Sequence, residues 1–207
     1  MSAPEPKDGA PAGALDDEAE VREALRRNDR YLHEFIEALA ICPYARSCRE
    51  SGRLHREVLL LSEPDVEAVA AHIRRLDAEA RPEIDVGLLL LPRLRIEAQP
   101  FERFVSNVQR AYQANRSQPI QFFVVAFHPE LPMNLKNRDV AVRFMRRSPD
   151  PTIQLVRPEA IERVRGDRDS ESVSRAIAEA GLRTVREHDP EALAALLAGM
   201  RGPARAG

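Results

Sequence analysis

The chain has 207 residues, 43% of them hydrophobic, and its 31 basic and 33 acidic residues leave a net charge of −2. This length supports one sizeable hydrophobic core, and the balanced charge excludes the broad basic field that would favour nucleic acid as a partner. There is no apolar run long enough to cross a bilayer and no signal-peptide pattern at the N-terminus, so we expect a cytoplasmic protein that does not bind membranes.

The first predicted element is a long amphipathic helix. Residues 1–16 are rich in Pro, Gly, Ala and acidic residues, which predicts a disordered tail. From Asp17 to Ala40 apolar residues recur at helical spacing, and Pro43 ends the pattern. After a polar loop, Glu57–Leu61 is predicted to be a short buried strand.

A second helix and a second strand follow. Ser62 is placed to cap this helix, with Pro64 near its first turn and Asp65 completing a capping-box pattern. Ile84–Leu91 is nearly all apolar, which is typical of a strand covered on both faces. A third amphipathic helix is predicted to begin near Pro100.

Strands that alternate with helices favour right-handed crossovers and parallel pairing. Ile120–Phe127 is the third apolar run, and Thr152–Val156 is predicted to be a short fourth strand at the sheet edge. We therefore predict an α/β fold: a small, mainly parallel sheet of three or four strands with helices on both faces. The domain should occupy residues 17–200, before a flexible tail at 201–207, and its last helices are predicted at Pro158–Arg165, Ser172–Ala180 and Pro190–Met200.

Cys42 is the first candidate for chemistry. A thiolate is a nucleophile and a soft metal ligand when its pKa is lowered, and Arg46, Arg49 and Arg53 are near enough in sequence to lower it. The end of the preceding helix opposes this effect, because its dipole disfavours an anion. The alternative is a half-buried cysteine that packs the end of the helix. Cys48 stands at neither a redox nor a zinc spacing from Cys42, so structural zinc is not expected.

His128 is the second candidate, because it follows a predicted strand at its carboxyl end, where ligands gather in open parallel sheets. It can serve as a general base, an acid or a ligand, or merely cap the strand and bond a backbone carbonyl. Arg146, Arg147 and Ser148 stand in a turn stiffened by prolines. Arginine forks suit carboxylates and phosphates, although a solvated surface turn is the alternative.

Three short segments resemble, in their order and spacing, a bacterial family catalogued as domain of unknown function 1415: Cys42–Arg46, Ala126–Pro129 and Arg147–Pro151. The resemblance spans residues 30–165. It implies one site formed by Cys42, His128, Arg147 and Ser148, and it brings no known reaction.

The chain departs from this family at two positions. The family usually has a histidine shortly after the Ser-Pro-x-Pro unit, where this chain has Gln154, and an aromatic residue between the prolines, where this chain has Asp150. A family site that used two histidines would therefore be altered here.

Three functional hypotheses follow. The first is an enzyme for group transfer or hydrolysis on a small anionic metabolite, with Cys42 and His128 as catalytic residues and a substrate-binding set of Arg46, Arg147, Ser148 and Gln154. The second is a non-catalytic anion-binding or accessory protein that uses the same pocket. The third, a metal-dependent enzyme using Cys42 and His128, is the weakest, because glutamine is a poor replacement for a histidine ligand. We predict no metal and no cofactor, and the oligomeric state stays open.

Overall fold

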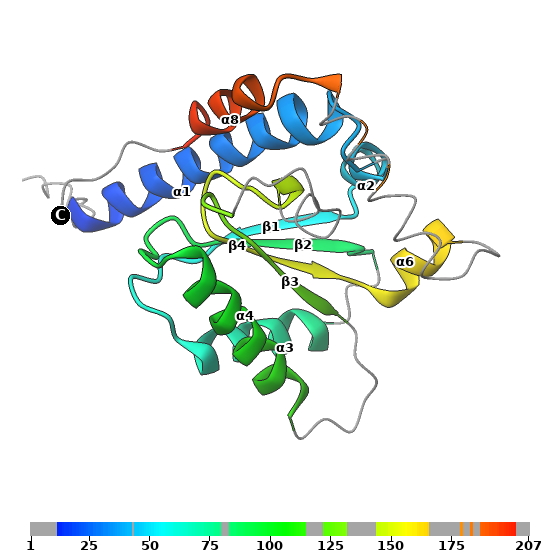
Figure 1. The fold of residues 1–207 in the computed structure, drawn as a ribbon. Helices are drawn as coiled ribbons and strands as arrows, with labels where there is room; N and C mark the ends of the chain where they lie inside the picture. The colour runs from blue at the N-terminus through cyan, green and yellow to red at the C-terminus, as the bar shows by residue number, and fades with distance from the viewer. Residues whose placement is uncertain are drawn as a thin grey trace, which may run out of the picture.

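The computed structural model describes residues 12–42, 44–79, 83–114, 122–131, 144–165 and 187–201, together with residues 179 and 183. Within these ranges one four-stranded sheet has the order β1-β2-β4-β3, with helices on both faces (Figure 1). The strands are β1 (Leu54–Val58), β2 (Val86–Leu90), β3 (Phe123–Phe127) and β4 (Thr152–Val156). The α/β class and the placement of three apolar runs in one sheet are confirmed, although β1 begins three residues before the predicted Glu57.

The sheet is mixed and mostly antiparallel, so the prediction of a mainly parallel sheet is wrong. Only β1 and β2 pair in parallel, whereas β4 runs antiparallel to both β2 and β3. The strands β1, β2 and β3 do point the same way, as their crossover connections favour. The prediction failed because β4 inserts between β2 and β3 instead of lying at the edge. The central position buries the side chains of Ile153 and Leu155 completely.

Two helices cover one face of this sheet: α3 (Val66–Ala78) and α4 (Ala98–Gln113). The N-cap of α3 is Asp65, not Ser62, and its carboxylate accepts a hydrogen bond of 2.9 Å from the backbone N–H of Ala68. The core of this layer joins apolar side chains of both helices to the sheet, among them Ile73, Phe101, Leu89 and Leu155.

The opposite face is covered by α1 (Ala12–Arg30), by its continuation η1 (Tyr31–Glu37) and by α8 (Pro190–Ala198) (Figure 1). The continuation is a π-helix with a wider turn, and hydrogen bonds between residues five apart extend past its end, as from Ala38 N–H to the carbonyl of His33. Helix α1 starts inside the segment 1–16 that was predicted to be disordered, while residues 1–11 lie outside the described part of the chain.

Two short helices complete the description. They are α2 (Ala45–Glu50), which leads into β1, and α6 (Pro158–Arg165), which confirms a predicted helix. The helix predicted at Ser172–Ala180 falls almost entirely outside the described residues. No helix within the described ranges has the length and apolar character needed to cross a bilayer.

The strand directions bring four connections to one end of the sheet. In register, Val58 is aligned with Leu90, Leu90 lies opposite Thr152, and Thr152 lies opposite Phe127. We call the end formed by these four residues the carboxyl end. The chains that leave β1, β2 and β3 and the turn that enters β4 therefore meet there.

Candidate functional site

A cavity of about 1030 Å³ opens at the carboxyl end of the sheet. Its walls come from the N-terminal half of α1, the loop after β2, the loop after β3, the turn before β4 and Arg201, which follows α8. Ligands of open α/β sheets gather outside the carboxyl ends of strands, where connections diverge. We therefore take this carboxyl-end cavity as the candidate site.

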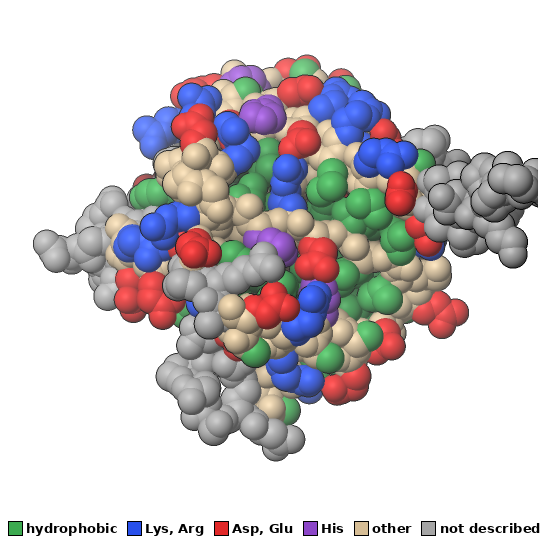
Figure 2. Space-filling model, turned by 180° about the vertical axis from the view of Figure 1, so that it is seen from behind, with side chains coloured by type: hydrophobic (Ala, Val, Ile, Leu, Met, Phe, Trp, Pro, Cys, Tyr) green, Lys and Arg blue, Asp and Glu red, His purple; other side chains and the backbone are tan. Residues whose placement is uncertain are grey.

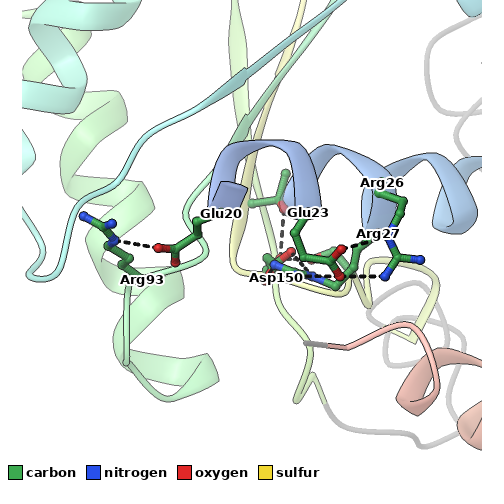
Figure 3. A network of polar contacts seen from close by, with 8 residues as sticks. Glu20, Glu23, Arg26, Arg27, Arg93 and Asp150 are labelled. Atoms are coloured by element: carbon green, nitrogen blue, oxygen red, sulfur yellow. Dashed lines mark hydrogen bonds and ion pairs between the residues drawn. The ribbon is translucent and has the colours of Figure 1, made fainter. Parts of the chain in front are cut away.

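A buried ion pair closes the floor of the cavity. The guanidinium of Arg27 donates to both carboxylate oxygens of Asp150, with distances of 3.0 Å from Nε and 2.9 Å from Nη2. Both side chains are nearly buried, at 8% and 11% exposure. Burial raises the pKa of the Asp150 carboxyl, and the hydrogen bonds from Arg27 oppose that rise. The pair joins α1 to the turn before β4 (Figure 3).

A second arginine holds α1 from the other side. The Nε of Arg93, in the loop after β2, donates to Glu20 at 2.9 Å (Figure 3). Its Nη2 contacts Asp17. Glu20 and Asp17 both belong to α1. The helix is thus tied to two different loops across the cavity, and these contacts neutralise much of the charge on the walls.

Arg95 differs from the other arginines of the cavity. It lines the cavity and is exposed, and it makes no hydrogen bond or ion pair to any described residue. The nearby Asp150 feels its charge, which helps to lower the pKa of that carboxyl, but Asp150 is already held by Arg27. Arg201 also lines the cavity and donates to the backbone carbonyl of Pro129. The guanidinium of Arg95 is therefore available to a ligand.

His128 lines the cavity, but both of its ring nitrogens are engaged by the backbone. Its Nε2 lies 2.9 Å from the carbonyl oxygen of Ile96, and the N–H of Glu130 donates to its Nδ1 at 3.1 Å. A carbonyl only accepts and an N–H only donates, so the proton sits on Nε2. Burial lowers the pKa of His128, which keeps the ring neutral. The imidazole therefore connects the loop after β2 with the loop after β3. This matches the alternative expected from the sequence, in which His128 caps the strand and bonds a backbone carbonyl.

Ser148 and Arg147 lie near His128 but do not line the cavity. The backbone N–H of His128 donates to the carbonyl of Arg146 at 3.1 Å, which brings the two predicted segments together. Ser148 is buried and donates its hydroxyl to the carbonyl of Asp150 at 2.6 Å. Arg147 donates its Nε to the carbonyl of Leu131 at 2.6 Å, and burial lowers its pKa. Both side chains hold backbone in place.

The structure does not bring Cys42 to this site. It packs against the core between η1 and the sheet, just before α2, and it is not among the residues that line the cavity. Burial raises the pKa of its thiol, and backbone hydrogen bonds from Tyr44 and Ala45 oppose the rise. Cys48 lies beside the first residue of β2, Val86, and burial is the main cause that raises its pKa to about 11. The expected convergence of Cys42 with His128 is not observed among the described residues.

The direction of α1 explains this separation. The helix starts over the carboxyl end of the sheet and runs toward the opposite end, where α2 leads into β1 (Figure 1). Its continuation η1 therefore delivers Cys42 and Arg46 far from the cavity. Arg46 is 64% exposed there, and its Nε lies 3.6 Å from a carboxylate oxygen of Glu37.

Gln154 lies in the middle of β4, opposite Leu88 of β2 and Val125 of β3, and does not line the cavity. Among the described residues, no group of three or more His, Cys, Asp or Glu side chains is arranged to hold a metal ion. The metal hypothesis thus gains no support from the geometry.

Three arginines of the cavity were not predicted from the sequence: Arg27, Arg93 and Arg95. A signal existed for Arg27, because it lies three residues after Ala24 and four before Tyr31, both of which are buried. Residues at these spacings share one helix face, so an arginine on that face needed a buried acidic partner. No local pattern distinguishes Arg93 from Arg95, because only the position of α1 decides which of them is paired.

Positive and negative side chains are mixed over the surface rather than gathered by sign, at least on the face shown in Figure 2. Nothing on this face resembles a continuous basic stripe of the kind that tracks a phosphate backbone.

A protein-family model described as "Protein of unknown function (DUF1415)" matches residues 23–194. No curated protein and no solved structure matches the chain. The matched range includes the loops that form the cavity and all four strands, but it begins after Asp16, Asp17 and Glu20.

Proposed function

The chain belongs to the DUF1415 family of proteins of unknown function, and we propose that it binds a small anionic metabolite in the carboxyl-end cavity. Arg95 is the principal anchor for the anion, and Arg201 is a second positive charge at the rim. A cavity of about 1030 Å³ accommodates a metabolite-sized ligand.

The observation that carries this proposal is that Arg95 makes no hydrogen bond or ion pair to a described residue. Arg27 and Arg93 line the same cavity, but carboxylates already occupy their donors. Arg95 faces the cavity without such a partner among the described residues. A guanidinium offers a planar fork of N–H donors that matches a carboxylate or a phosphate. The ligand that satisfies it is therefore an anion.

A binding or accessory function fits this geometry better than group transfer or hydrolysis. Nucleophilic catalysis needs a nucleophile within reach of a base, whereas Cys42 lies away from the cavity and burial raises the pKa of its thiol. His128 has both ring nitrogens engaged by the backbone. Its role in the proposal is to hold the shape of the cavity.

A thermal-shift screen with small dicarboxylates and phosphorylated metabolites tests the proposal. We expect at least one anion to stabilise the protein, because a ligand at 100 times its Kd adds about 2.7 kcal/mol to the free energy of unfolding. In Arg95→Gln this anion should bind about tenfold or more weakly, since a hydrogen bond to a charged group contributes roughly 1.5–3 kcal/mol. Arg95→Lys should retain part of the affinity.

Arg22→Gln is the matched control. Arg22 is an exposed arginine of α1 that pairs only with Glu18 in the described part of the chain, and it does not line the cavity. This variant should bind like the wild type. If no anion stabilises the wild type, or if Arg95→Gln binds as tightly as Arg22→Gln, the proposed function is wrong.

A further inference from the structure

The carboxyl-end cavity has walls of unlike charge. Helix α1 contributes four carboxylates and one arginine to its lining, while the loop after β2 contributes Arg93 and Arg95 and no acidic residue. A cavity built only for an anion would not place so many carboxylates around it, because like charges repel a ligand most strongly where water is scarce.

Most of these charges neutralise one another. Arg93 pairs with Asp17 and Glu20, and Arg27 pairs with Asp150 and contacts Glu23. These pairs hold the cavity together and leave few groups for a ligand.

The charges that remain are of both signs. Arg95 has no ion pair to a described residue, and the same holds for the carboxylates of Asp16 on α1 and Glu130 after β3. All three side chains belong to exposed residues of the cavity lining. A ligand that satisfies them carries an anionic group and a cationic group in one small molecule.

We propose that the ligand is a zwitterion of the amino-acid type, with a carboxylate or phosphate bound by Arg95 and an ammonium group facing Asp16 and Glu130. This inference rests on the proposed function and narrows its ligand class. The carboxylates of Asp16 and Glu130 also supply specificity, since they repel an anion that lacks the ammonium group.

Matched pairs of small molecules test the ligand class. Calorimetric titration of the full chain compares succinate with aspartate, glutarate with glutamate, and 3-phosphoglycerate with phosphoserine. In the first two pairs the second molecule adds an ammonium group at the carbon next to a carboxylate, and in the third pair an ammonium group replaces the hydroxyl at that carbon. We expect the ammonium-bearing member of at least one pair to bind fivefold or more tightly than its partner.

Two variants test which residues cause the preference for the ammonium-bearing molecule. The double variant Asp16→Asn/Glu130→Gln should bind the ammonium-bearing molecule no more tightly than its plain-anion partner. Its affinity for the plain anion should be equal to or higher than that of the wild type. Arg95→Gln should lower the affinity for both molecules of a pair by a similar factor. Because all three residues are exposed, these changes should leave the melting temperature without ligand nearly unchanged, and Glu18→Gln on the outer side of α1 is the control.

The outcomes separate the two proposals. If a plain anion binds as well as or better than its ammonium-bearing partner in every pair, the zwitterion inference is wrong while anion binding stands. A preference that survives Asp16→Asn/Glu130→Gln also overturns the inference. If no member of any pair binds, the inference falls, and the wider anion screen then decides the proposed function.

Discussion

Several polar side chains that the sequence presents as candidates for catalysis or ligand binding form hydrogen bonds to the backbone in the structure. His128, Ser148 and Arg147 each donate a hydrogen bond to a main-chain carbonyl. Buried polar groups must find hydrogen-bond partners, and at the ends of strands the nearest partners are backbone groups. A histidine or arginine beside a proline thus predicts a structured loop as readily as it predicts a site.

The carboxylate of Glu37 allows the contribution of one ionised side chain to the stability of the fold to be tested. It is a carboxylate with only 3% exposure that accepts hydrogen bonds of 2.7 and 2.9 Å from Arg49, with Arg46 and His33 each 3.6 Å away. The hydrogen bonds from Arg49 hold the pKa of Glu37 below its usual value of 4.5. A lowered pKa means that the ionised carboxylate stabilises the fold above pH 4.5 and that this stabilisation is lost as the pH falls through the folded-state pKa.

We expect Glu37→Gln to lower the free energy of unfolding at pH 7 by about 1.5–3 kcal/mol, the range for hydrogen bonds to charged groups. The difference from the wild type should shrink as the pH drops below 4.5. Urea unfolding between pH 3 and pH 7 measures both effects, with the exposed Glu18→Gln as control. A difference that stays constant across this range would contradict the pKa argument.

Among the elements, α1 decides the character of the site. It crosses one face of the sheet (Figure 1). Its start contributes a wall of the cavity, while its continuation carries Cys42 away from the cavity. Two arginine clamps, Arg27 with Asp150 and Arg93 with Glu20, fix this part of the helix over the carboxyl end. The cavity therefore depends on the docking of α1.

The clamp between Arg27 and Asp150 can be tested by a double-mutant cycle. Arg27→Met should destabilise the protein by about 3–5 kcal/mol, because it leaves a buried carboxylate without a partner. The double variant Arg27→Met/Asp150→Leu should recover much of that loss, since no charge is then buried. Denaturant unfolding measures the cycle, and a loss of less than about 1 kcal/mol in Arg27→Met would show that the pair is not a buried clamp.

For the whole molecule, the central place of β4 is the main finding about topology. It separates β2 from β3, which otherwise run in the same direction as β1. Gly87 of β2 lies opposite Leu155 of β4, and a Cβ atom at Gly87 would lie 3.2 Å from Leu155 Cδ1. The close approach explains why a glycine stands within this buried strand.

This strand order predicts a coupled pair of substitutions. Gly87→Ala should cost about 1–3 kcal/mol of stability through overpacking, and it should cost less when Leu155→Ala supplies room. Chemical denaturation of the four proteins gives the coupling energy, which we expect to be roughly 0.5–3 kcal/mol. Leu193→Ala, on the opposite face of the sheet, is the control and should be additive with Gly87→Ala. Additivity of Gly87→Ala with Leu155→Ala would argue against the pairing of β2 with β4.

The sequence alone determined the α/β class, the four strands in outline and the apolar faces of the helices, because hydrophobic periodicity records which side of each element is buried. It also placed His128 and the Arg147 turn beside each other, since both adjoin strand ends. Only the tertiary structure decided that β4 is central, that α1 carries Cys42 away from the cavity, and that the carboxylates of α1 pair with Arg93 whereas Arg95 meets no carboxylate within the described ranges. These features depend on contacts such as Arg27 with Asp150, which are 123 residues apart, and no local pattern encodes which distant partner a side chain will meet.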